Sequence, residues 1–265
     1  MLFYITETIN NMGLWSLSKL DKIGEFSLFG YKFILTFIKQ PLHRKQLVNY
    51  MYIVSIQSFG IIFLTGAFAG LAVSLQAYIG FSRVHAEQFT GLVSTLGMVR
   101  ELGPVLTGII VSAKTGSSIA AELGTMKITE QIDALQTLGI NPFNFLVVPR
   151  ILATTIMMPF LTIFSMMFGI LASYYLCVHT LLINEQAYIS IIQEYLKLSD
   201  ITGGLIKAIL FGLIISLIGT YMGYKTIGGA KGVGSATTNA VVIGSILILI
   251  GNYILSSFLY NTGIA

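Results

Sequence analysis

Four charged residues, Arg100, Glu101, Lys114 and Glu122, lie within or beside an apolar stretch of the sequence. Charged side chains are costly inside a membrane, and where they occur there they usually bind a substrate or relay ions. A relay of this kind would make the protein an ion-coupled secondary transporter. This hypothesis predicts transport that follows an ion gradient and does not depend on ATP.

Residue patterns for enzymatic chemistry are missing from the sequence. The histidines His43, His85 and His179 do not have the spacing of metal ligands, and no GxSxG motif is present. The glycine-rich stretch 228–235 lacks the GxxxxGK(S/T) pattern of a phosphate-binding loop. No basic patch with interleaved aromatic residues indicates a nucleic-acid partner. We therefore expect no catalytic residue, metal or cofactor in this chain, so ATP, if it is used, would be hydrolysed by a partner subunit.

A short amphipathic helix is predicted at about 125–138, and Gly139 is a typical residue to end it. Its apolar face is formed by Ile128, Ile132 and Leu135. Its polar face carries Glu130 and Asp133. An acidic face that points away from the membrane predicts a docking element for another protein. A helix that only rests on lipid head groups is the alternative, but an anionic leaflet would repel its acidic residues.

The composition indicates a membrane protein. Of the 265 residues, 55% are hydrophobic and only 10% are charged, whereas soluble domains have about 25% charged residues. Several runs without Asp, Glu, Lys or Arg are long enough to cross a bilayer, which takes about 20 apolar helical residues. We predict an all-α integral membrane protein with about five transmembrane helices, near residues 54–79, 92–113, 147–183, 205–224 and 240–260. The third segment could form one span or two, and in the fourth we expect Lys207 to extend to the membrane surface.

The positions of Lys and Arg predict how these helices are oriented, because such residues stay on the cytoplasmic side of a membrane or its organellar equivalent. Most of them lie in the N-terminal segment and in the loops after the second and fourth spans. The N-terminus and the 125–138 helix are therefore expected on the inner side, cytoplasmic or stromal. The C-terminus is expected on the opposite side.

Residues 1–50 are expected to form an inner-side segment with an interfacial helix, and residues 51–265 a single membrane-spanning domain. Phe26, Phe29, Phe33 and Phe37 recur at helical spacing. This pattern is typical of a helix that lies in the membrane interface with its aromatic side in the acyl region. A helix packed against a partner on the inner side is the alternative.

Glycine pairs at small-xxx-small spacing occur in the first and fourth spans, Gly66 with Gly70 and Gly219 with Gly223. Such pairs let two helix backbones approach closely within lipid. They predict close helix packing, and a dimer contact is one way to provide it.

The stretch from Glu101 to Arg150 resembles the MlaE-type permease family of ABC transporters, the lipid-trafficking permeases of Gram-negative inner membranes and chloroplast envelopes. The similarity is densest in ELGPVLTGIIVSAKTGSSIAAELGTMKITEQIDALQTLGINP and in the VVPR that follows. The layout of an N-terminal interfacial helix and five spans also resembles this family. Lys114 differs, because family members usually have Arg there, and Lys lacks the planar group that binds in a bidentate manner.

The resemblance implies a permease subunit that forms a homodimer and moves phospholipid or a related lipid. It also implies two ATPase subunits on the inner side and a lipid-binding MCE-domain protein on the opposite face. The 125–138 helix would be the coupling helix that docks to the ATPase, with Glu130 and Asp133 as polar contacts and Lys127 as a flanking charge. The family's charges near the membrane boundary correspond to Arg100, Glu101, Lys114 and Glu122.

Two other interpretations stay open, the ion-coupled transporter described above and a non-transporting membrane scaffold. The scaffold predicts that changes at Glu130 and Asp133 alter binding without altering any flux. We expect a chloroplast membrane, in particular the inner envelope, because heavy use of Ile, Lys and Asn favours an AT-rich genome and the N-terminus does not resemble a transit peptide. A bacterial inner membrane is the alternative.

Overall fold

The computed structural model describes residues 2–261, with the side chains of residues 17, 20, 21 and 23–261. Within this range every regular element is helical, which confirms the all-α prediction. The elements in chain order are α1 (Leu2–Lys39), α2 (Arg44–Ser82), η1 (Glu87–Phe89), α3 (Thr90–Gly97), η2 (Met98–Leu102), α4 (Gly103–Val111), η3 (Ser112–Gly116), α5 (Ser117–Ile128), α6 (Gln131–Thr137), η4 (Phe143–Val147), α7 (Val148–Tyr175), η5 (Leu176–Thr180), α8 (Glu185–Tyr195), α9 (Leu198–Tyr224) and α10 (Gly229–Asn261). η1 is a 3-10 turn, and η2 to η5 are π turns.

Five helical segments among the described residues are long and apolar enough to cross a membrane: Arg44–Ser82, Glu87–Ile128, Phe143–Thr180, Leu198–Tyr224 and Gly229–Asn261. The predicted number of spans is therefore confirmed. The third segment is one continuous helix and not two. The fourth begins at Leu198 rather than near residue 205, because Asp200 and Lys207 are paired inside the bundle and do not end the span.

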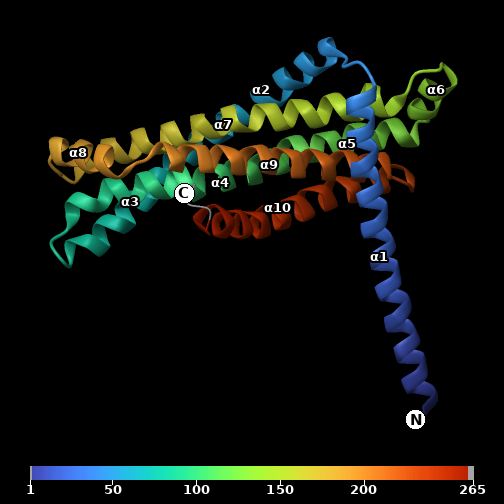
Figure 1. Ribbon diagram of the computed structural model, residues 1–265, viewed down its shortest axis with the longest axis horizontal. Coiled ribbons are helices and arrows are strands. Elements are labelled where there is room, and N and C mark those ends of the chain that lie inside the picture. Colours follow the sequence, from blue (N-terminus) through green and yellow to red (C-terminus); the bar gives the residue numbers. More distant parts are fainter. Residues whose placement is uncertain (1, 262–265) are drawn as a thin grey trace.

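The spans form an elongated bundle (Figure 1). α2 packs along α7, α7 along α9 and α9 along α10, while the second span contacts all four of these helices. α8 lies at one end of the bundle and α6 at the other. We call the α6 end the inner end and the α8 end the outer end, in keeping with the predicted orientation.

Both glycine pairs bring helices of the same chain together. A Cβ at Gly66 would lie 2.7 Å from the Ser165 carbonyl oxygen of α7, and a Cβ at Gly219 would lie 2.9 Å from the Gly116 carbonyl oxygen of the second span. Real Cβ contacts are essentially never this short. The two pairs thus allow close packing within the chain, as small residues do in membrane helices generally.

α1 lies across the bundle axis at the inner end (Figure 1). Its phenylalanine face was expected to point into the acyl region, but Phe29 and Phe33 are buried against the protein. The reason is that aromatic rings of η4 and of the inner end of α9 cover this face. The opposite face exposes Leu28, Tyr31, Ile34 and Ile38. This second face, together with Phe37, belongs to the exposed apolar surface of α1.

An ion pair outside the spans also joins α1 to the end of α9. The Lys225 ammonium donates to Glu25 at 3.0 Å, and this contact lowers the pKa of the Glu25 carboxyl below its ordinary value. Both side chains are about half exposed, so solvent screens the pair and its contribution to stability is small.

Replacing Gly70 by Ala should destabilise the bundle, because the added methyl group would overlap the Gly169 backbone of α7. We expect the midpoint of thermal unfolding in detergent to fall by several degrees, in line with an overpacking cost of about 1–3 kcal/mol. Gly80→Ala is the matched control, because a Cβ there would meet no atom within 4 Å. Equal effects of the two substitutions would contradict this packing.

Candidate functional site

The structure does not bring the four charged residues of the second span together. Arg100 and Glu101 lie in the π turn η2, Lys114 lies in the π turn η3, and Glu122 lies in α5. At a rise of 1.5 Å per residue, Glu101 and Glu122 are about 30 Å apart along the helix. This separation does not favour a single charge relay. Instead, the charges pair with residues of other helices at two levels of the bundle.

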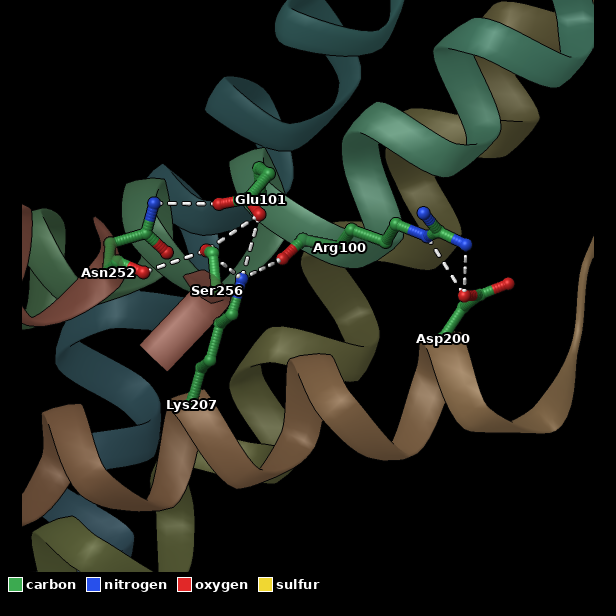
Figure 2. A network of polar contacts seen from close by, with 6 residues as sticks. All are labelled: Arg100, Glu101, Asp200, Lys207, Asn252 and Ser256. Carbon is green, nitrogen blue, oxygen red and sulfur yellow. Dashed lines mark hydrogen bonds and ion pairs between the residues drawn. The ribbon is translucent and has the colours of Figure 1, made fainter. Parts of the chain in front are cut away.

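The first level lies toward the outer end, where six polar residues form what we call the outer network (Figure 2). Its members are Arg100, Glu101, Asp200, Lys207, Asn252 and Ser256. The Lys207 side chain is only 4% exposed. Its ammonium donates to the Arg100 carbonyl oxygen at 2.8 Å, to Glu101 Oε1 at 2.9 Å and to Ser256 Oγ at 2.7 Å. All three donors of the ammonium are thus used inside the bundle.

The sequence of the second span explains why a backbone carbonyl is free to accept from Lys207. Pro104 has no backbone N–H, so the Arg100 carbonyl cannot receive the usual helical hydrogen bond from the residue four positions on. Gly204 allows α9 to come close at this point, because a Cβ there would overlap the Val99 carbonyl oxygen. The π turn, the proline and the glycine together place the carbonyl within reach of Lys207.

Glu101 receives donors from two other spans. In addition to Lys207, its carboxylate accepts from Asn252 Nδ2 at 2.7 Å, and Ser256 Oγ lies 2.9 Å from Oε1. Asn252 and Ser256 are one helical turn apart on α10. Glu101 therefore fastens α10 to the second span, while Lys207 fastens α9 to it.

Arg100 and Asp200 form the other half of the outer network. Asp200 is fully buried, and its Oδ1 accepts from Arg100 Nε at 2.8 Å and lies 2.6 Å from the second guanidinium nitrogen. Its Oδ2 accepts from the Lys197 backbone N–H at 3.0 Å, which fixes the start of α9. A cavity of about 200 Å³ opens beside these side chains. It is lined by Arg100, Glu101, Asp200, Gly203, Gly204, Lys207, Ser256, Leu259 and Tyr260.

The expectation that Lys207 extends to the membrane surface is wrong. The sequence shows its partners only as isolated polar residues in other spans, and Glu101 is 106 positions away in the chain. The one available signal was the repeated occurrence of a charge within a predicted span, since such charges are generally paired inside a bundle.

The second level lies at the inner end, where Glu122 pairs with Arg150. The distance between their nearest nitrogen and oxygen atoms is 3.1 Å, and Arg150 is only 3% exposed. Arg150 also donates to the Leu146 carbonyl at 2.9 Å, and its guanidinium lies 4.4 Å from the centre of the Tyr50 ring. This cluster joins α5, α7 and α2. Lys114 is exposed, and its side chain forms no ion pair with any residue that the structure describes.

The predicted 125–138 helix is interrupted in the structure. α5 ends at Ile128, Glu130 adopts a left-handed backbone with φ of 58°, and α6 runs only over Gln131–Thr137. The reversal brings Lys127 Nζ within 3.1 Å of the Asp133 carboxylate. These two residues would lie on different sides of a continuous helix, so their ion pair requires the break.

The break also changes which side chains share a face. Ile132 is fully buried under α6, and Leu135 packs beside it, but Ile128 belongs to α5 and not to this group. Glu130 is exposed, as predicted, whereas Asp133 is half-exposed and paired with Lys127. Gly139 ends α6 as predicted, with φ of 75° and a 3.0 Å bond from its N–H to the Gln136 carbonyl.

These polar groups hold helices together, and none of them forms a metal site. Among the residues that the structure describes, no three His, Cys, Asp or Glu side chains are placed to hold a metal ion. Chemically, the arrangement offers two polar levels, a cavity at the outer one, and at the inner end a short helix preceded by the exposed Glu130.

Known proteins match this chain along most of its length. The sequence profile of the family described as Permease MlaE matches residues 47–258. A probable ABC transporter permease protein of Rickettsia typhi is 43% identical over 95% of this chain and 97% of its own length. The chloroplastic protein TRIGALACTOSYLDIACYLGLYCEROL 1 of Arabidopsis thaliana is 36% identical over 93% of this chain and 71% of its own length. The intermembrane phospholipid transport system permease protein MlaE of Haemophilus influenzae is 33% identical over 90% of this chain and 91% of its own length.

Replacing Lys207 by Met should lower the thermal unfolding midpoint in detergent, because Glu101 would lose its charged partner and the Arg100 carbonyl its donor. Removing one member of a buried pair typically costs about 3–5 kcal/mol, and partial exposure of Glu101 places the expected loss below that range. Lys114→Met is the matched control, since it removes an exposed, unpaired lysine from the same bundle. Adding Glu101→Gln to Lys207→Met should recover part of the loss. A midpoint unchanged by Lys207→Met would refute the assigned role of the network.

Proposed function

Because the chain belongs to the MlaE permease family and is the permease subunit of an ABC transporter, we propose that its cargo is phospholipid or a related lipid and that a separate ATPase subunit powers the movement. The relative from Haemophilus influenzae carries phospholipid transport in its name. The observation that carries the proposal for this chain is α6, a short helix at the inner end of a continuous span, with the exposed Glu130 directly before it.

In this proposal, α6 acts as the coupling helix. Only Thr129 and Glu130 separate it from α5, which is the inner part of the span Glu87–Ile128. Ile132 packs α6 against the bundle, so a displacement of α6 would be transmitted directly to the second span. The π turns η3 and η2 lie further along this span, and π turns are frequent at functional sites in helices. Movement at the inner end would in this way reach the outer network.

The cavity at the outer network supports a lipid head group as the cargo's polar part. Arg100 is 42% exposed beside this cavity, and guanidinium groups bind phosphate well. Leu259 and Tyr260 line the same cavity and supply apolar surface. A lipid phosphate could therefore meet Arg100 while the acyl chains stay against apolar side chains.

A homodimer in this proposal forms along α10. Only 11% of the apolar window of α10 is buried within the chain, the smallest share of the five spans. Ile246, Ile250 and Tyr253 are exposed along it. A second copy that packs there would cover this face and place two outer cavities close together.

In this proposal, the other partners bind at the two ends of the bundle. The ATPase would bind at the inner end, around α6, and an MCE-domain lipid-binding protein would face the outer end, around α8. For the location we propose a chloroplast membrane, in particular the inner envelope, with a bacterial inner membrane as the alternative. The chloroplastic relative from Arabidopsis thaliana supports the first and the Rickettsia typhi relative is bacterial.

Reversing the charge of Glu130 tests the coupling role of α6. We expect Glu130→Lys to reduce several-fold both the ATPase that copurifies with the tagged permease and the ATP-driven movement of fluorescent phospholipid in liposomes. Glu130 is exposed, so the fold should tolerate the change. Glu194→Lys is the matched control for ATPase binding alone, because it reverses an exposed acid in α8 at the outer end, far from the proposed ATPase site.

Three outcomes separate the functions. Loss of ATPase binding and of transport in Glu130→Lys, with ATPase binding intact in Glu194→Lys, supports the coupling role. Normal ATPase binding and transport in this variant would show that Glu130 does not carry it. ATPase binding that depends on Glu130 in a preparation that moves no lipid at all would favour the scaffold instead.

A further inference from the structure

Four aromatic residues form a cluster at the inner end where α1 meets the bundle. We call this the inner aromatic cluster, and it consists of Phe29 in α1, Phe143 in η4, and Tyr221 and Tyr224 at the end of α9. The Phe29 ring centre lies 4.9 Å from that of Phe143, 5.5 Å from that of Tyr221 and 6.1 Å from that of Tyr224. Phe143 and Tyr224 are 6.0 Å apart. Three of these contacts are edge-on and the Phe29–Tyr224 contact is tilted, and such ring contacts favour one arrangement of the four residues.

Tyr224 belongs to two packed groups at once. On one side it contacts the inner aromatic cluster, and on the other it packs against the apolar group under α6. That second group consists of Ile119, Leu123, Ile132 and Leu146, with Leu135 beside it. One ring therefore lies between α6 and α1. Because packed interiors have low compressibility, a shift of Ile132 would be passed on to this ring.

The segment that follows α6 is also held to the corner between α1 and α2. Asn141 Nδ2 donates to Gln40 Oε1 at 3.1 Å, and Asn144 Nδ2 donates to the Pro41 carbonyl at 3.2 Å. The His43 and Phe145 rings meet edge-on with centres 5.4 Å apart. Residues on both sides of this corner thus contact the chain directly after α6.

We propose that the inner aromatic cluster and this corner form a second route by which α6 acts on the membrane part, through α1 and the start of α2. The first route runs back from α6 into α5. Phe29, Phe143 and Tyr224 are positioning residues in the second route, since they set where α6 rests. The proposal rests on the proposed coupling role of α6.

The second route has a consequence for α1. This helix lies across the bundle axis (Figure 1). It exposes Leu28, Tyr31 and Ile34. Coupling between two sites is reciprocal, so whatever holds α1 in place also biases the position of α6. Binding of an ATPase to α6 would in turn shift α1 relative to the bundle.

Distances between two spin labels test the physical connection without any need for an ATPase. Labels are attached at Leu28→Cys in α1 and Leu138→Cys after α6, two exposed positions, in a Cys177→Ser background of the purified full chain. We expect one narrow distance distribution. Phe29→Leu and Tyr224→Leu should broaden it at least twofold, because each removes a ring between α1 and α6. Tyr31→Leu is the matched control, since it removes an exposed ring two residues from Phe29. A narrow distribution in both cluster variants would overturn the proposal.

Lipid moved per ATP hydrolysed, measured with the whole complex in liposomes, tests whether the connection matters for transport. The ratio should fall several-fold in Phe29→Leu and Tyr224→Leu and stay unchanged in Tyr31→Leu. A normal ratio in both cluster variants would overturn the second route. Failure of the proposed function can be told apart from failure of the second route. If α6 is not the coupling helix, Glu130→Lys leaves ATPase binding intact, whereas the label distances still report on the packing of α1 against α6.

Discussion

Charge inside a hydrocarbon layer has to be neutralised within the protein, and this constraint organises the bundle. Lys207 shows it most clearly, since its buried ammonium is satisfied by a carboxylate, a hydroxyl and a backbone carbonyl. That carbonyl lacks its usual helical donor because Pro104 has no backbone N–H. Asp200 and Arg150 are likewise buried and paired. Each pair joins different helices, so neutralising the charges also fixes how the spans pack.

The pairs divide the second span into three parts with different roles. The outer network holds the region of η2 to α9 and α10, and the Glu122 pair holds α5 to α7 and α2. Between these levels lies η3 with the exposed Lys114. Glycines at the close helix contacts keep the backbones near enough for the pairs to form. A span that is held at two levels and continues into α6 is suited to carry a displacement from one membrane surface toward the other.

The number of spans could be predicted from the sequence, because hydropathy and length decide whether a helix can cross a bilayer. The partners of the charges could not, since Lys207 and Glu101 come together only through the packing of three spans. The break at Glu130 was missed because the apolar spacing of Ile128, Ile132 and Leu135 is equally regular with or without it. The phenylalanine pattern of α1 correctly indicated that one face of this helix is covered. It could not show whether lipid or protein covers it, because aromatic residues suit both surroundings. Residues for the coupling role were expected from a resemblance, and the structure adds the pairing of Lys127 with Asp133.

The energy source of transport tests the account most directly. The tagged permease, purified with whatever ATPase accompanies it, is reconstituted in liposomes, and the movement of a fluorescent phospholipid is followed. The account predicts movement that requires hydrolysable ATP and is unchanged when proton and sodium gradients are abolished. Movement that follows an ion gradient and continues without ATP would contradict it and would return the charges of the outer network to the role of an ion relay.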